Sequence, residues 1–381
     1  MYNIQLMNKI AKLGTDNFDR AKYNVGEDVS SPDGILVRSA DLHSTDFGPE
    51  LKCIARAGAG VNNIPCDKCA DNGIVVFNTP GANANGVKEI VIAALLLASR
   101  DIIGGIEWAK TLAGDPDAAK KVEKGKAQFA GGEIMGKTLG VIGLGAIGRL
   151  VANVAVDLGM NVVGYDPYLS EAAAELLKPE VKKASGYDEI YSTADFITLH
   201  IPATPETKGM FNADVIAKLK DGVKLLNFSR ADLVISSDLI SAVESGKIAK
   251  YIVDFPTSDI IGVHKNIIAV PHLGASTEES EDNCAVMAVR QTIDYLENGN
   301  IVNSVNYPRL TLDRSGDSRI CVLSKNADPV SITTAVGDFV ASSSASKGDF
   351  GYAVYDVEGT VSADKLDSLS KIPGVIKVFT V

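Results

Sequence analysis

Two residues that follow apolar runs could act on a small anionic substrate. Arg230 comes shortly after Lys224–Phe228, and His272 comes shortly after Asn266–Val270. An arginine fork can bind a carboxylate and the adjacent oxygen together, whereas an imidazole titrates near neutral pH and can exchange a proton. The pair therefore fits chemistry at the carbon beside a carboxylate, although Arg230 alone could equally form a surface salt bridge. His200 also ends an apolar run, and a loop or cofactor-edge position is favoured for it over acid–base chemistry.

A glycine motif supplies the site for a cofactor. An apolar run leads into G-x-G-x-x-G, in which Gly143 allows a tight turn, Gly145 lets a phosphate approach bare backbone, and Gly148 lets a helix pack closely. Asp166 ends the next apolar run, where a carboxylate can accept both ribose hydroxyls of NAD and would repel the extra phosphate of NADP. A simple glycine turn is the alternative, but strand, glycines, helix and acid in register favour a dinucleotide site.

Local basic and glycine-rich segments stand out because the chain is acidic. It has 37 Lys and Arg against 48 Asp and Glu, a net charge of −11, which disfavours nucleic-acid and membrane partners. Arg38 and Ser39 end one apolar run, and Ala57–Gly60 follow another with amides that could hold an anion. A tight turn is an equally weighted interpretation of the glycines.

These residues need parallel sheets to position them. Apolar runs at 34–39, 53–56 and 74–77 alternate with helical stretches, which predicts one parallel α/β domain. A long helix from about 83–85 to Arg100 follows. Six further runs predict a complete dinucleotide-binding sheet, at 139–142, 161–165, 195–200, 223–228, 248–254 and 266–270. A helix from Glu278 to Leu296 should pack back on the first domain. We therefore expect two doubly wound domains, one Rossmann-type and one flavodoxin-like, with 1–84 (completed by 281–310) binding substrate and 85–280 binding NAD.

The last segment, 317–381, follows a polar connector and predicts a small α+β module of strand, helix, two strands, helix and strand. We expect the serine-rich stretch Ser342–Ser346 to end the first of these helices.

Cysteine usage and apolar run lengths bear on the compartment. Five cysteines do not indicate a disulfide framework, and Cys66 and Cys69 lack the second half of a metal site, so a pair of helix cysteines and no metal are expected. No charged-then-apolar leader opens the sequence, and the most apolar run, Ile90–Ala98, is too short to span a bilayer. A cytoplasmic location is the expectation.

Four segments together resemble the D-isomer-specific 2-hydroxyacid dehydrogenases: Ile54–Ile64, Gly136–Leu139 before the glycine motif, Asn227–Arg230, and Pro271–Thr277. Val37–Ser39, Phe77–Asn83 and Gly274–Glu279 favour the branch that acts on phosphoglycerate, and the C-terminal segment resembles, less closely, an ACT regulatory domain. The resemblance covers residues 1 to about 310.

The resemblance implies hydride transfer between NAD and a 2-hydroxy acid by an Arg–carboxylate–His set. By motif, Arg230 would bind the substrate carboxylate and keto oxygen, and His272 would exchange the proton at C2. Asp254 would contact the NAD carboxamide. The implied cofactor residues are Gly143, Gly145, Ala146, Ile147, Gly148, Asp166, His200, Thr207, Ser229, Asp254, His272 and Gly274. The implied substrate residues are Arg38, Ser39, Ala57, Gly58, Ala59, Gly60, Asn83, Arg230 and His272.

The chain departs from the family pattern at several places. Asp259 stands where the family has Glu and could pair with His272, but Ser258 could occupy that position instead. Ala231 replaces a common glycine after Arg230, and no Trp follows Lys124–Lys126, the loop expected to lend a basic group to a neighbouring subunit of a homodimer or homotetramer. The C-terminal module lacks the usual Pro-Gly pair and has Asp328 nearby, which predicts weak or no binding of L-serine.

Three functions fit the sequence. The first is an NAD-dependent dehydrogenase that opens serine synthesis from phosphoglycerate. The second is a sister enzyme for another 2-hydroxy acid, such as glycerate or a phosphorylated four-carbon acid. The third is a non-enzymatic NAD-sensing scaffold of the corepressor kind that shares the fold, which Arg230 and His272 argue against.

Overall fold

The computed structural model describes residues 1–381, which divide into two compact units. Unit 1 comprises Met1–Asn83 and Glu278–Val381, and unit 2 comprises Ala84–Thr277. Each unit is described separately. No helix in either has the length and apolar character that crossing a membrane requires.

Unit 1 contains a five-stranded parallel sheet in the order β2-β1-β3-β4-β5. This is the flavodoxin-like order, so the expected fold of the first domain is confirmed. Its strands are β1 (Tyr2–Leu6), β2 (Tyr23–Gly26), β3 (Gly34–Val37), β4 (Cys53–Arg56) and β5 (Val75–Phe77). Its helices are α1 (Lys12–Thr15), α2 (Cys66–Asp71) and α11 (Glu278–Asn298).

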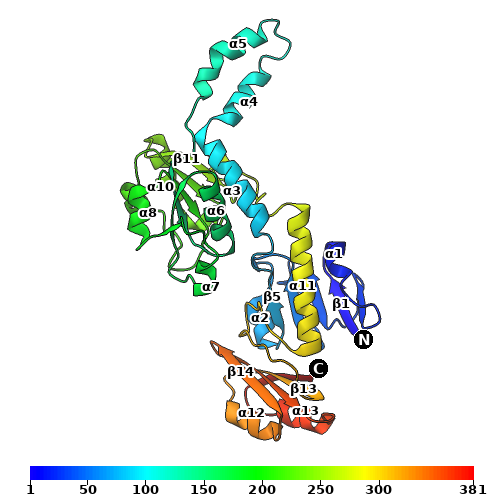
Figure 1. Cartoon of the computed structure of the whole chain (residues 1–381). Coiled ribbons are helices and arrows are strands. Elements are labelled where there is room, and N and C mark those ends of the chain that lie inside the picture. The colour runs from blue at the N-terminus through cyan, green and yellow to red at the C-terminus, as the bar shows by residue number, and fades with distance from the viewer. The chain divides into compact units, whose positions relative to one another are not determined.

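The long helix α11 packs against this sheet, as the sequence predicts. Ala288 and Leu296 on α11 share one hydrophobic core with Ile4 and Leu36 of the strands. Gly14 in α1 permits a close approach, because a Cβ there would lie 2.6 Å from the backbone of Ala285. Figure 1 shows α11 running alongside α1 and β1.

Unit 2 contains a seven-stranded parallel sheet in the order β12-β11-β10-β9-β6-β7-β8. The strand order reverses beside β6, which is the Rossmann pattern with its ligand crevice at the carboxyl ends of the strands. The strands are β6 (Thr138–Ile142), β7 (Asn161–Tyr165), β8 (Lys182–Lys183), β9 (Phe196–Leu199), β10 (Val223–Asn227), β11 (Ile248–Val253) and β12 (Ile267–Ala269). The helices are α3 (Ala84–Ser99), α4 (Ile102–Lys110), α5 (Ala118–Gly125), α6 (Ala146–Asp157), α7 (Glu171–Ala174), α8 (Tyr187–Thr193), α9 (Ala213–Lys218) and α10 (Ser236–Glu244), with 3₁₀ turns η1 (Lys126–Phe129) and η2 (Ala231–Leu233).

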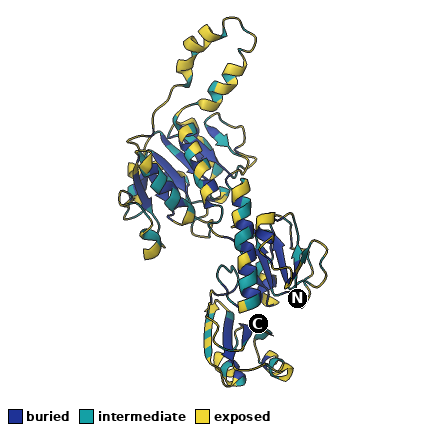
Figure 2. Ribbon diagram, turned by 45° about the vertical axis from the view of Figure 1, so that its right-hand side comes forward, coloured by how far each residue is buried: buried dark blue, intermediate teal, exposed yellow.

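Within unit 2, an arm made of α4, α5 and η1 extends away from the sheet after α3. The chain returns at Gly132, whose amide donates to the carbonyl of Ser99. No residue of α4, α5 or η1 is buried. Figure 2 shows only exposed and intermediate residues in the helices of this arm, in contrast to the buried strands of the sheet.

The C-terminal module of unit 1 is a four-stranded antiparallel sheet, order β14-β15-β13-β16, with two helices on one face (Figure 1). Its elements are β13 (Ser318–Lys325), α12 (Pro329–Val336), β14 (Ala341–Lys347), β15 (Phe350–Val357), α13 (Ala363–Ser370) and β16 (Val375–Thr380). The predicted order of elements is confirmed. The expectation that Ser342–Ser346 ends a helix is wrong, since these residues form β14 and pair along β15.

The face of the module's sheet opposite its helices joins the core of the substrate-side sheet, because Leu323 and Val354 pack with Tyr295 of α11. A fully buried ion pair fixes the junction. Arg319 binds Asp356 through two contacts, of 2.6 and 2.9 Å, and donates to the carbonyls of Asn298 and Leu312. The end of α11 is thereby held by the module.

Candidate active site

The glycine motif of unit 2 forms an open cradle before α6. Gly143 has φ +91°, and a Cβ there would lie 2.5 Å from the carbonyl oxygen of His200. A Cβ on Gly148 would lie 1.9 Å from the carbonyl oxygen of Gly143, whereas one on Gly145 would meet nothing within 4 Å. Gly145 precedes α6 without any side-chain cap, so the first amides of α6 are available to a phosphate. The cradle fits the pyrophosphate of a dinucleotide.

Asp166 lies at the carboxyl end of β7 and is tied to this cradle. Its Oδ2 accepts the amide of Leu144 at 2.9 Å, and its Oδ1 accepts the amide of Tyr168 at 2.9 Å. These bonds orient the carboxylate beside the glycine turn, where the family motif places the adenosine ribose.

Three other predicted cofactor residues, His200, Thr207 and Ser229, lie after strands of the same sheet. Although His200 is partly exposed as a residue, its ring Nδ1 is buried without a partner, and its Nε2 lies 3.0 Å from the Thr198 hydroxyl. Burial lowers the pKa of His200 to about 3, so the ring stays neutral and is unsuited to proton exchange near pH 7. The hydroxyl of Thr207 donates to the Pro202 carbonyl, and that of Ser229 donates to the Leu199 carbonyl.

Arg230 follows β10 and begins the turn η2. Its Nη1 donates to the carbonyl of Ser229 at 2.6 Å, and its guanidinium carbon lies 5.3 Å from the centre of the Phe255 ring. The following residue, Ala231, is in a right-handed 3₁₀ turn, which alanine adopts without strain. The missing glycine therefore imposes no backbone penalty in this structure.

His272 occupies a turn that Asp254 holds in place. Its φ of +52° is unusual for a residue with a side chain. The buried carboxylate of Asp254 accepts the amides of Leu273 and Gly274 at 2.7 and 2.9 Å. A Cβ on Gly274 would lie 2.5 Å from Asp254 Oδ2, so glycine is needed for this approach. Burial raises the pKa of Asp254, and the two amide bonds oppose that shift. The structure thus places Asp254 under the His272 turn.

The imidazole of His272 packs on an aromatic ring instead of a carboxylate. The ring centres of His272 and Phe255 are 4.4 Å apart at an interplanar angle of 47°. No hydrogen bond or ion pair joins His272 to Asp259 or Ser258. The exposed Asp259 instead bonds to the side chains of Thr257 and Ser236, which lower its pKa.

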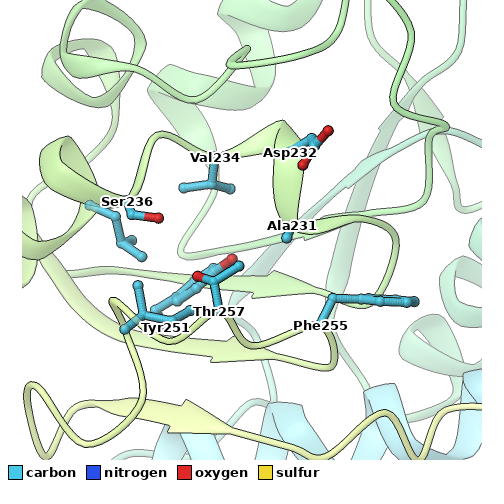
Figure 3. A pocket seen from close by; sticks show the side chains of 9 residues that line it. Ala231, Asp232, Val234, Ser236, Tyr251, Phe255 and Thr257 are labelled. Atoms are coloured by element: carbon cyan, nitrogen blue, oxygen red, sulfur yellow. The ribbon is translucent and has the colours of Figure 1, made fainter.

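The same loops enclose a small cavity of about 110 Å³. Figure 3 shows Phe255 at one end of it, with its ring pointing away from Tyr251 and Thr257. Ser236 and Thr257, the two partners of Asp259, both line this cavity.

Unit 1 contains the remaining anion-binding candidates. The side-chain oxygen of Asn8 accepts the amides of Ser39 and Ala40, which fixes the loop after β3. The guanidinium of Arg38 lies in that loop and pairs with Glu281 of α11 at 2.7 Å.

The loop Ala57–Gly60 presents unused amides. The amides of Ala57 and Gly58 donate to backbone carbonyls, but those of Ala59 and Gly60 have no acceptor within the chain. The carbonyls of this loop are bound instead by Thr79 and Asn78, which leaves the amide side open to an anion. Nearby in sequence, Asn83 has a buried Oδ1 without a hydrogen-bond partner.

Comparison with known proteins identifies the family of the NAD-binding domain. Residues 93–274 match the family model described as D-isomer specific 2-hydroxyacid dehydrogenase, NAD binding domain. The D-3-phosphoglycerate dehydrogenase of Synechocystis sp. is 38% identical over 296 residues, covering 75% of this chain and 50% of that protein. That of Bacillus subtilis is 31% identical over 333 residues, covering 82% and 60% respectively.

Among solved structures, NAD⁺-bound 3-phosphoglycerate dehydrogenase of Entamoeba histolytica matches with a TM-score of 0.63 and 27% identity, covering 81% of this chain and 99% of that one. Residues 93–274 form an NAD-binding domain of the D-isomer-specific 2-hydroxyacid dehydrogenase family, and NAD is the cofactor of unit 2. The chain spans 50–60% of the length of the two relatives named above.

Proposed function

We propose that this chain is an NAD-dependent oxidoreductase that oxidises 3-phospho-D-glycerate to 3-phosphohydroxypyruvate, the first step of serine biosynthesis. The observation that carries the proposal is that Arg230 and His272 contact one ring, Phe255, at the sheet edge where the glycine cradle also lies. The parallel strands β6, β10, β11 and β12 bring their carboxyl ends to that edge. The names of the relatives support phosphoglycerate as the substrate.

The residues divide the chemistry between them. The Arg230 fork binds the substrate carboxylate and the C2 oxygen, which aligns C2. The His272 imidazole accepts the proton of the C2 hydroxyl as the C2–O bond becomes a carbonyl. NAD, which the glycine cradle and Asp166 would hold, would supply the hydride acceptor for C2. In unit 1, the family resemblance assigns the amides of Ala59 and Gly60 to the substrate carboxylate and the Arg38 guanidinium to the distal phosphate.

One assay distinguishes the proposed function from its two alternatives, a sister dehydrogenase and an NAD-sensing scaffold. Production of NADH is followed with 3-phosphoglycerate, glycerate and 4-phosphoerythronate at equal concentrations. The proposal expects the largest kcat/KM with 3-phosphoglycerate. A larger value for either other acid would favour a sister dehydrogenase, and tight NAD binding without turnover on any acid would favour an NAD-sensing scaffold.

We also propose that the protein is a homodimer or homotetramer in the cytoplasm, with no nucleic-acid partner. The arm exposes Ile102, Ile103 and Ile106, which are 40, 42 and 51% exposed, and a second copy of the chain would cover them. The five unbridged cysteines favour a reducing compartment. Light scattering of an Ile106→Glu variant tests the arm, because a monomer is expected and an unchanged mass would contradict it.

The C-terminal module is proposed to help subunits associate and to bind L-serine weakly or not at all. In the loop before α12, Asp328 accepts the amides of Val330 and Ser331. These amides are therefore engaged, and the carboxylate adds negative charge where an amino acid's carboxylate would need donors.

A further inference from the structure

Phe255 is the only side chain that contacts both Arg230 and His272 among the ring contacts of unit 2. It follows β11, the strand between those that lead to Arg230 and to His272. Arg230 follows β10 and His272 follows β12, so three adjacent parallel strands deliver the three residues to one edge of the sheet. The order of the strands in the sheet is therefore enough to bring the three residues to the same edge.

The neighbouring residue fixes the backbone of the same turn. Asp254 holds the amides of Leu273 and Gly274, while Phe255 packs on the imidazole of His272. Since His272 has a positive φ, its ring direction depends on both constraints. A side chain held this way loses little conformational freedom when substrate binds.

The chemistry of the ring also suits both partners. The face of a phenyl ring attracts a guanidinium at 5.3 Å, and the same ring attracts an imidazolium once His272 has accepted a proton. Asp259, the carboxylate that could have served His272, is engaged by Ser236 and Thr257. The Phe255 ring, and not the Asp259 carboxylate, therefore contacts the His272 imidazole.

We propose that Phe255 is a positioning residue that orients Arg230 and His272 for the reaction. The proposal rests on the function proposed above, because it assigns those two residues to the substrate. Phe255 acts through them and not on the substrate. A misplacement of about 1 Å in such groups typically costs on the order of a hundredfold in rate.

The test compares Phe255→Leu, which removes the ring at similar volume, with Phe255→Tyr, which keeps it. We expect kcat/KM for 3-phosphoglycerate to fall about ten- to a hundredfold in Phe255→Leu and to stay within about threefold in Phe255→Tyr. The Kd for NAD should be unchanged in both, because the glycine cradle is intact. Phe339→Leu, at a partly exposed ring of the C-terminal module, is the matched control and should retain wild-type kinetics.

A proton NMR measurement reads the contact without activity. The chain has four histidines, and His272→Gln assigns the His272 imidazole signal. The ring current of Phe255 should displace that signal, and the displacement should vanish in Phe255→Leu while thermal unfolding remains cooperative.

An unmoved His272 signal in Phe255→Leu, a kcat/KM within twofold of wild type, or equal losses in the Leu and Tyr variants would each overturn the positioning role. A wild-type protein that turns over no 2-hydroxy acid would overturn the proposed function instead, whereas the NMR result would still decide whether the ring orients His272.

Discussion

Arg38 is already paired with Glu281 at 2.7 Å, across two segments of unit 1 that are more than 200 residues apart in the chain. The guanidinium and the carboxylate are 39 and 42% exposed, so the pair is readily exchanged for another anion. The cation expected to meet the distal phosphate of the substrate therefore begins in an ion pair. In the proposed function, binding of the substrate phosphate by Arg38 would compete with Glu281.

Substitutions at this pair should act only on phosphorylated substrates. Arg38→Ala should raise KM for 3-phosphoglycerate and leave glycerate little changed, because the cation acts through the group it neutralises. Glu281→Gln should lower KM for 3-phosphoglycerate about two- to fivefold, since the competing carboxylate is removed. Initial-rate assays with both acids measure this, and equal effects on both substrates would mean that the pair only holds structure.

Asp166 should make NAD strongly preferred over NADP. The extra phosphate of NADP would meet a like charge beside the Leu144 amide, and no arginine follows in Pro167–Leu169. Asp166→Ser should raise kcat/KM with NADP, which lowers the ratio of kcat/KM with NAD to kcat/KM with NADP. Equal use of both cofactors by the wild type would show that Asp166 does not face the ribose.

Much of this fold follows from the sequence because its strands are continuous apolar runs. All six strands predicted for unit 2 are present, and so are the three predicted between residues 34 and 77 of unit 1. The serine-rich strand β14 is missed because it is an edge strand: Ser342, Ser344 and Ser346 are exposed on one face, and its backbone pairing with β15 carries no apolar signal.

The sequence predicts which residues follow the strands, but it does not predict the contacts that their side chains make with one another. Arg230 and His272 stand out because each follows an apolar run. The shared contact with Phe255, the turn that Asp254 holds, and the orientation of Asp259 depend on through-space packing of three loops. No spacing in the chain encodes those contacts, so Asp259 remains a predicted partner of His272 that this structure does not pair with it.

Because of His200, the free energy of unfolding should decrease as the pH is lowered. The pKa of His200 is about 3 in the folded chain because of burial, against an ordinary value of 6.5, so the unfolded state binds a proton first as the pH drops below 6.5. Its contribution is complete above pH 6.5 and should be about 2 kcal/mol smaller at pH 5. Urea titrations of the wild type and His200→Gln, above pH 6.5 and at pH 5, test this. The prediction is contradicted if the free energy of unfolding falls equally in both proteins between the two pH values.

The buried pair Arg319–Asp356 should be costly to break on one side. Arg319→Met leaves a buried carboxylate without its partner and should cost about 3–5 kcal/mol, whereas Arg319→Met combined with Asp356→Leu should recover much of that loss. Calorimetry of the unfolding of the full chain measures it. Lys371→Met, which breaks an exposed pair with Asp367 in the same C-terminal module, is the control and should leave the transition nearly unchanged. A similar small shift for Arg319→Met would mean that the pair does not fix the junction.

The most direct test of the proposed reaction is NADH formation from 3-phosphoglycerate by the wild type, His272→Gln and Arg230→Lys under steady-state conditions. The wild type should turn over. His272→Gln should lose about a hundred- to ten-thousandfold in kcat with little change in KM, because only proton transfer is removed. Arg230→Lys should lose in both parameters, because lysine keeps the charge but not the planar fork. No NADH from the wild type, or full turnover by His272→Gln, would contradict the assignment.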